Sequence, residues 1–256
     1  MTYQAITFEI ADDVAVLSLN RPDVMNALNR QMRTEITQAI GIAGKKSRVL
    51  VMTGIGRAFC AGQDLADTSA AFDLQAVLNE EYVPMLRAIH DCPVPTIAAV
   101  NGAAAGAGAN LALACDVVIA SEAASFTQAF TRIGLIPDAG GTWGLPRQIG
   151  LARAMGAMLF ADKISAVQAV EWGMIYEAVP DAEFAAHWQA RATALAKGPT
   201  AAYRHLKTAL QATFDSTLEE QLAVEARLQG ECGQTADFIE GVAAFLQKRP
   251  PMFQGR

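Results

Sequence analysis

A single carboxylate lies in a loop rich in glycine and proline, "GLIPDAGGTWGLPR", which runs from Gly134 to Arg147 and has no other ionisable side chain between Gly134 and Leu145. The acid is Asp138, and its neighbours in the loop are mostly apolar. Burial among apolar groups disfavours the charged form of a carboxyl group, so it raises the pKa toward the range of a useful general base. Aspartate also favours turns and helix N-caps. The loop therefore predicts either a general base or an ordinary turn or capping residue.

Two further loops carry glycines, "CAGQDL" from Cys60 to Leu65 and "GAAAGAGAN" from Gly102 to Asn110. Each joins a predicted buried strand to a helix or helix-like segment. Free backbone N–H groups in such loops, with the positive end of a helix dipole, can hold a negatively charged oxygen. Two such loops meeting at one point would form an oxyanion hole. Alternatively, the glycines only allow tight turns and close packing.

Motifs of several other chemistries do not match. Leu111 stands where a dinucleotide-binding fingerprint needs its third glycine. The stretch "GRAFCAG" lacks the lysine and the Ser/Thr of a phosphate-binding P-loop, and no G-x-S-x-G occurs. No cluster of side chains has metal-ligand spacing, so no metal is expected. The cysteines are too far apart for a zinc site or a compact disulfide framework and indicate a reducing cytoplasm: Cys60, Cys92, Cys115 and Cys232.

Composition limits the class of protein and its partners. Hydrophobic residues make up 52% of the 256 residues and charged residues 18%, as is typical of a packed globular protein. A net charge of −6 without a basic cluster argues against a nucleic-acid surface. The longest apolar stretches are interrupted by Asn101, Asn110 and glycines, so no membrane span is expected. The N-terminal residues do not resemble a secretory signal.

The elements that must position these loops follow from hydrophobic patterning, which predicts a β-rich front and a helical tail. Strands are expected over 6–10, 14–20, 48–54, 95–100, 117–121 and 125–130, the first two as a hairpin, with an irregular loop over 55–65. Helices are expected over 29–43, 74–92 with a kink near Pro84, 109–116 and several segments between 142 and 173, and Asn26 could cap the first. From 181 to 248 only helices are predicted, with a break at "KGP".

Five motifs agree in order and spacing with one known family: "NRPDVMNALN", "GRAFCAGQDL", "PTIAAVNGAAAGAGANLALACDVVIAS", "GLIPDAGGTWGLPR" and "SAVQAVEWGMI". On these motifs the chain resembles the enoyl-CoA hydratase/isomerase (crotonase) superfamily. The resemblance implies an α/β fold, with a crotonase-like spiral of ββα turns and the acyl-CoA site in residues 1–197, and a C-terminal helical oligomerisation region in 198–256. It also implies an acyl-CoA substrate, whose coenzyme A is no separate cofactor, and a homotrimer or dimer of trimers.

Carried over by position, the resemblance assigns roles to individual residues. The backbone N–H groups of Gln63 and Ala107 would hold the thioester oxygen. The path of the CoA moiety would be lined by Met25, Ala61, Gly62, Asp64 and Leu65. The tail ends in the densest group of cations in the chain, so Lys248, with Arg249 beside it, is expected near the nucleotide phosphates.

The departures from the family pattern bear on the reaction. Hydratases of this family use two glutamates that flank a water molecule, and this chain has Asn110 and Phe130 at those positions. Asp138 stands where the hydratases carry a glycine. We therefore interpret Asp138 as the catalytic acid/base and assign Asn110, Phe130 and Trp143 to the acyl pocket.

One acid/base group with an oxyanion hole suits isomerisation, because a proton is moved and no water is added. The loop around Asp138 and the stretches "ARAMGAMLF", "AVEWGMI" and "GVAAFLQKRPPMFQGR" most resemble the family members that rearrange the ring epoxide of phenylacetyl-CoA to an oxepin and shift enoyl-CoA double bonds. Two alternatives stay open. One is an enoyl-CoA hydratase of fatty-acid or aromatic degradation, and the other is a non-catalytic acyl-CoA-binding protein.

Overall fold

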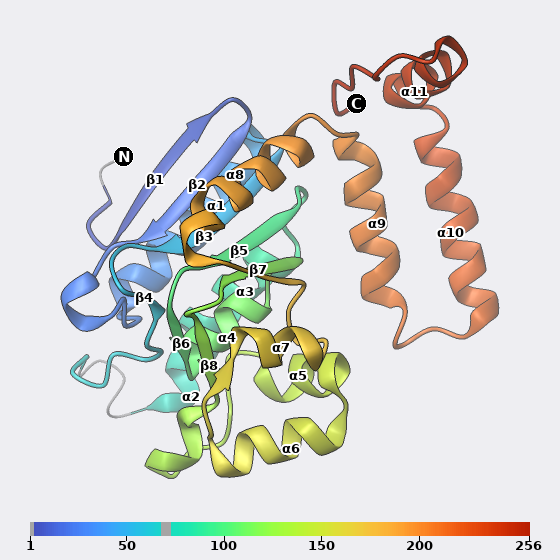
Figure 1. Cartoon of the computed structure of the whole chain (residues 1–256). Helices are drawn as coiled ribbons and strands as arrows, with labels where there is room; N and C mark the ends of the chain where they lie inside the picture. Colours follow the sequence, from blue (N-terminus) through green and yellow to red (C-terminus); the bar gives the residue numbers. More distant parts are fainter. Residues whose placement is uncertain (1–2, 68–72) are drawn as a thin grey trace.

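The computed structural model describes residues 3–67 and 73–256, and its strands form two sheets (Figure 1). The six-stranded sheet has the order β1-β2-β3-β5-β7-β10 and the four-stranded sheet the order β4-β6-β8-β9. The strands are β1 (Ile6–Ala11), β2 (Val14–Leu19), β3 (Val49–Gly54), β4 (Ala58–Cys60), β5 (Thr96–Val100), β6 (Ala103–Ala105), β7 (Val117–Ser121), β8 (Ser125–Thr127), β9 (Ile164–Ser165) and β10 (Glu177–Val179).

Successive pairs of strands divide between the two sheets. β3, β5 and β7 lie parallel in the larger sheet, while β4, β6 and β8, which follow them in the chain, lie parallel in the smaller one. Helical segments follow each pair, so the chain winds as repeated ββα turns. The predicted α/β fold with a ββα spiral is confirmed, as is the hairpin of β1 and β2.

The helices cover the sheets and then continue beyond them (Figure 1). They are α1 (Arg30–Lys46), α2 (Leu74–Val77), a π-helical turn (Leu78–Tyr82), α3 (Val83–His90), α4 (Ala107–Leu113), α5 (Gly141–Ile149), α6 (Leu151–Phe160), α7 (Ala166–Glu171), α8 (Asp181–Ala196), α9 (Thr200–Ala212), α10 (Leu218–Cys232) and α11 (Ala236–Gln247). Within the described residues, no helix has the length and apolar character needed to cross a membrane.

The central strands β3 and β5 of the larger sheet are buried on both faces, as is typical of parallel strands, whereas the edge strand β1 is mostly exposed. Val49 and Val51 of β3 pack in one apolar cluster with Phe184 of α8. Leu50 and Met52, the alternate residues of the same strand, belong to the main core on the other side. α8 therefore covers one face of this sheet, and the remaining core fills the space on the other face.

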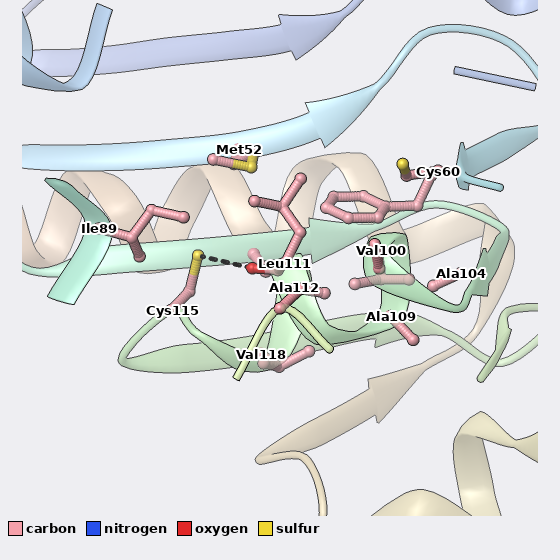
Figure 2. Packing of buried hydrophobic residues seen from close by; sticks show 14 of the residues in the cluster. Met52, Cys60, Ile89, Val100, Ala104, Ala109, Leu111, Ala112, Cys115 and Val118 are labelled. Atoms are coloured by element: carbon pink, nitrogen blue, oxygen red, sulfur yellow. Dashed lines mark hydrogen bonds between the residues drawn. The ribbon is translucent and has the colours of Figure 1, made fainter. Parts of the chain in front are cut away.

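α4 is the most deeply buried helix of the site region, because its side chains are small or apolar on every face. Figure 2 shows Leu111 and Ala112 among Met52, Ile89 and Val118, with a weak contact from the Cys115 thiol to the Leu111 carbonyl at 3.9 Å. The core thus holds α4 rigidly, and with it the loop that precedes α4.

The N-cap assigned to Asn26 is wrong. Asn29 caps α1, and its side chain accepts a hydrogen bond from the N–H of Met32 at 2.9 Å. Asn26 is fully buried in the left-handed backbone region, with φ +57°, and its amide donates to the carbonyls of Ile55 and Ala58. Its function is to fasten the loop before α1 to the segment around β4.

Several predicted boundaries are also wrong. The supposed loop over 55–65 contains β4, and the glycine-rich turn after β5 contains β6. Three-residue strands are too short to show an alternating pattern, and the alanines of β6 have little preference for strands. The strand expected over 125–130 ends at Thr127, and a 3-10 turn (Ala129–Ile133) follows it. β9 interrupts the stretch of 142–173 that was expected to be helical.

The tail from α8 onward is helical, as predicted, and the break at "KGP" separates α8 from α9. α9, α10 and α11 form an arm that stands away from the sheets (Figure 1). Arg48 fastens its base, donating to the Thr200 hydroxyl at 2.9 Å and to the carbonyls of Gly198 and Phe253. The relative positions of core and arm therefore depend on a partly buried set of hydrogen bonds at the junction.

We predict that Leu111→Ala lowers the free energy of unfolding by about 2–5 kcal/mol, because Leu111 is fully buried in α4 and the substitution leaves a cavity. Urea denaturation followed by circular dichroism measures the loss. Leu65→Ala is the matched control, since Leu65 is 72% exposed and its truncation should change stability little. Equal losses in the two variants would contradict the central position given to α4.

Candidate functional site

The two glycine-bearing loops meet at the carboxyl ends of the neighbouring parallel strands β4 and β6. The contact is made by Gly62, whose φ is +95°. A Cβ at this position would lie 2.7 Å from the carbonyl oxygen of Ala105 and 3.4 Å from the amide nitrogen of Ala107. Only glycine suits both the backbone conformation and the close approach, so the convergence of the loops predicted from the sequence requires Gly62.

Hydrogen bonding of Leu28 fixes the loop around Gln63. The Leu28 N–H donates to the Gly62 carbonyl at 2.7 Å, and the Leu28 carbonyl accepts from the Asp64 N–H at 3.1 Å. In this parallel bridge, the N–H of the intervening Gln63 points to the opposite side. Neither it nor the N–H of Ala107, the first residue of α4, donates to another group within the described residues.

Asp138 lies partly buried in its loop, and its Oδ1 atom has no hydrogen-bond partner among the described residues. Burial raises the pKa of this carboxyl group to about 6, with an opposing contribution from its own backbone N–H. The direction agrees with the one expected from the apolar loop. α5 has Gly140 as its N-cap and no side chain capping it, so Asp138 is not the cap of this helix.

Asn110 holds the backbone of the Asp138 loop. It is 3% exposed, and its Nδ2 donates to the Asp138 carbonyl at 2.7 Å. Its Oδ1 accepts from the Gln128 side chain at 2.8 Å. Both the nitrogen and the oxygen of the amide of Asn110, the residue assigned to the acyl pocket, are therefore hydrogen-bonded to protein groups. Gln128 orients this amide, and no pattern in the sequence pointed to Gln128.

Phe130 and Trp143 have different surroundings. Phe130 is buried, and its ring lies 3.8 Å from the point where a Cβ on Gly106 would be, beside the loop that contains Ala107. Trp143 is 51% exposed on α5, and the Arg147 guanidinium lies 4.3 Å from its ring centroid. The structure brings Phe130 next to the converging loops, whereas the contacts of Trp143 lie with Arg147 and, edge to face, His90.

The residues expected along the CoA path come from two segments that are hydrogen-bonded to each other. The Ala61 N–H donates to the Met25 carbonyl at 2.9 Å, and Met25 and Leu65 are exposed. The Asp64 carboxylate forms an ion pair with Arg21 at 2.8 Å. Beside them is a groove of about 350 Å³ lined by Arg21, Asn29, Arg30, Gln31, Asp64, Ala66 and Asp67. No pattern in the sequence pointed to the arginines of this groove, although Arg21 belongs to the "NRPDVMNALN" motif.

The cations of the tail are not near these loops within one chain. Lys248 is exposed at the end of α11, which lies well apart from β4 and β6 (Figure 1). The Arg249 guanidinium binds both carboxylate oxygens of Glu240, at 2.6 and 2.9 Å. Arg249 is thus paired within its own chain, and the approach of Lys248 and Arg249 to nucleotide phosphates stays a prediction.

Comparisons with known proteins agree over nearly the whole chain. A family model described as "Enoyl-CoA hydratase/isomerase" matches residues 9–256. A Rhodobacter capsulatus protein named "Probable enoyl-CoA hydratase" is 61% identical over all of both chains. The 1,2-epoxyphenylacetyl-CoA isomerase of Escherichia coli is 44% identical over 98% of each chain. The crystal structure of an enoyl-CoA hydratase from Bacillus anthracis superposes with a TM-score of 0.92 at 33% identity, covering 99% of this chain and 100% of that one.

We predict that Asp138→Asn stabilises the protein at pH 8. The folded-state pKa of about 6 lies above the ordinary value of 3.8, so the charged form costs stability above pH 6 and the cost disappears as the pH falls below 4. One pKa unit corresponds to about 1.4 kcal/mol, and partial solvent access reduces the effect, so a gain of about 1–2 kcal/mol is expected.

Denaturant titrations of both proteins at pH 8, 6 and 4 measure the difference. Asp162→Asn is the control, because the Asp162 side chain is exposed and forms no hydrogen bond or ion pair among the described residues. A stability difference for Asp138→Asn that does not change with pH would contradict the burial of a costly charge.

Proposed function

The chain belongs to the enoyl-CoA hydratase/isomerase family, and on that premise we propose that it is an acyl-CoA isomerase with Asp138 as its single acid/base group. The proposal rests on two observations: two backbone N–H groups without a partner among the described residues, and a carboxylate whose pKa is raised to about 6. The hydrogen bond from Asn110 ties the loop of that carboxylate to α4, the helix that begins at Ala107. A group with a pKa close to neutrality can both accept and return a proton.

In the proposed reaction, the thioester oxygen accepts hydrogen bonds from the N–H groups of Gln63 and Ala107. The Asp138 carboxylate removes a proton from a carbon of the acyl group, and the electron pair of that C–H bond forms the enolate. The two N–H groups stabilise the negative charge on its oxygen. Protonated Asp138 then returns the proton to another carbon, so the double bond moves while the composition of the substrate stays the same.

Isomerisation is favoured over hydration by the two positions where family hydratases have glutamates. The Asn110 amide is engaged with the Asp138 carbonyl and Gln128, and Phe130 has no ionisable group. The buried Phe130 ring beside Gly106 also supports an aromatic acyl group. We therefore propose that the chain converts ring-1,2-epoxyphenylacetyl-CoA to the oxepin-CoA, shifts enoyl-CoA double bonds, or does both. The name of the Escherichia coli relative supports the epoxyphenylacetyl-CoA substrate.

A second candidate is an enoyl-CoA hydratase, supported by the name of the Rhodobacter capsulatus relative. Incubation with crotonyl-CoA, a 3-enoyl-CoA and the ring-epoxide thioester, followed by mass spectrometry, separates the candidates. Isomerisation gives a product of unchanged mass that chromatography separates from its substrate, hydration adds one water, and absence of turnover leaves the substrate as it was. Hydration of crotonyl-CoA without any isomerisation would refute our proposal. Binding of all three thioesters without turnover would support the non-catalytic alternative.

We predict that Asp138→Asn lowers isomerase kcat by at least about 10²-fold, because the amide cannot accept the proton. In the wild type, kcat/KM should rise with pH through about 6, since the carboxylate must be ionised to act as the base. Stopped-flow absorbance and titration with acyl-CoA measure turnover and binding separately. Wild-type turnover in a folded Asp138→Asn variant would remove Asp138 from the mechanism.

We also propose that the protein forms trimers or dimers of trimers in which the arm packs on a neighbouring copy. Most of the large exposed apolar side chains of α9, α10 and α11 would then be covered: Leu206, Leu210, Leu218, Leu222, Phe238, Ile239, Val242, Phe245 and Leu246. In such an assembly, Lys248 would approach the neighbour's groove beside Arg21 and Arg30. All four cysteines are unpaired, which supports a cytoplasmic location.

We predict that Phe245→Glu lowers the oligomeric state, because Phe245 is 82% exposed in the single chain and a charge at a buried interface is unfavourable. Sedimentation velocity measures the change. Leu74→Glu on α2 is the control, since Leu74 is 47% exposed and lies outside the arm. A wild-type protein that sediments as a monomer would refute the interface.

A further inference from the structure

The side chain of Gln63 has no part in the proposed chemistry, which uses only its backbone N–H. Its Oε1 nevertheless accepts two hydrogen bonds, from the Arg33 guanidinium at 2.9 Å and from the Tyr82 hydroxyl at 2.5 Å. Its Nε2 donates to the Asp64 carbonyl at 3.2 Å. The side chain is therefore held at both ends by groups that come from α1, the π-helical turn and its own loop.

Arg33 connects this side chain to Leu28, whose two backbone hydrogen bonds to Gly62 and Asp64 form what we call the clamp of the loop. It is fully buried, and the nitrogen that donates to Gln63 also donates to the Leu28 carbonyl at 2.7 Å. Leu28 is the residue whose backbone binds Gly62 and Asp64 on either side of Gln63. One guanidinium thus contacts both the clamp and the residue that the clamp encloses.

The charge of Arg33 is balanced at the same place. The Glu81 carboxylate accepts from its Nε at 2.9 Å and from its Nη2 at 2.5 Å, and the Tyr82 ring lies 4.9 Å from the guanidinium carbon. Glu81 and Tyr82 are adjacent in sequence, and regular α-helical residues one apart face different directions. Here both belong to a π-helical turn, a rare conformation that is often found at functional sites.

The Tyr82 hydroxyl is suited to remain a neutral donor. The side chain is 2% exposed, and burial raises the pKa of its phenol, with Arg33 opposing and the charges of Asp138 and Cys60 adding to the rise. The hydroxyl therefore keeps its proton and its hydrogen bond to Gln63 throughout the range in which Asp138 titrates.

The direction of the Gln63 N–H depends on the peptide bond that joins Gly62 to Gln63. That peptide is planar and trans, so its N–H points opposite to the Gly62 carbonyl. The carbonyl is fixed by the Leu28 N–H. The clamp therefore sets the direction of the Gln63 N–H from the backbone, and the hydrogen bonds of the Gln63 side chain add a second restraint on the same peptide, beside a glycine whose backbone is the most easily moved.

We propose that Arg33 and Tyr82 are positioning residues of the oxyanion site, which lock the side chain of Gln63 so that its backbone N–H stays aimed at the thioester oxygen. The inference rests on the proposed function, because it requires the Gln63 N–H to be a donor to the substrate. Stabilisation of an enolate depends on preorganised donors, and a misplacement by about 1 Å can cost about 10²-fold in rate.

The variants that test this inference leave the backbone donor in place. Tyr82→Phe removes one hydroxyl, and Gln63→Met removes the acceptor while keeping a side chain of similar length. Tyr176→Phe is the matched control, because Tyr176 is 63% exposed. Arg33→Met is less useful, since it would leave the largely buried Glu81 carboxylate without its main partner.

Polarisation of a bound thioester carbonyl is measured with 4-dimethylaminocinnamoyl-CoA, whose absorption moves to longer wavelength as the carbonyl is polarised. Tyr82→Phe should reduce this shift and lower isomerase kcat about tenfold, with KM within about twofold of the wild type. The double variant Tyr82→Phe/Gln63→Met should be no slower than the slower single variant, because both changes remove the same contact.

A Tyr82→Phe variant with wild-type kcat and an unchanged absorption shift would overturn the inference. So would a loss of activity that accompanies a lower melting temperature while the shift of the bound probe stays the same, because the role would then be structural. Absence of any shift with the wild type and with Asp138→Asn would instead refute the oxyanion role of Gln63, and so the proposed function.

Discussion

The site depends on the contact between two loops at the carboxyl ends of β4 and β6. Gly62 lies against the backbone of Ala105 and Ala107, so the two free N–H groups are held by main-chain packing. The loops come from successive ββα turns, and the parallel pairing of their strands sets their separation. Any larger residue at Gly62 would push the loops apart and with them the two donors.

The polar groups around this contact form a connected chain of hydrogen bonds. Leu28 binds both sides of Gln63, Arg33 binds Leu28 and Gln63 together, and Glu81 neutralises Arg33. Asp138 and Gln128 differ, because the Oδ1 atom of one and the Oε1 atom of the other are buried without a hydrogen-bond partner among the described residues. The region therefore satisfies its supporting charges and leaves one carboxylate unsatisfied, a combination that is more typical of function than of stability.

The sequence predicted the longer elements because their patterns are local, whereas the meeting of the two glycine-bearing loops followed only from the family resemblance. The hairpin of β1 and β2 and the buried β5 show clear apolar runs, and Asp138 is conspicuous in its loop. Asn110 was assigned to a pocket from its position in the family pattern alone, and its bond to the Asp138 carbonyl spans 28 residues. Arg33 and Tyr82 were missed for the same reason, since no local pattern relates α1, the π-helical turn and the "CAGQDL" loop.

The hydrogen bond from Asn110 to the Asp138 carbonyl has a consequence for how such a chain could diverge. A glutamate at position 110 has no N–H to donate, so a chain that regained this residue of the hydratases would release the loop that carries its acid. Because that carbonyl belongs to the main chain, the residue at position 110 governs how the loop is held whatever side chain stands at position 138.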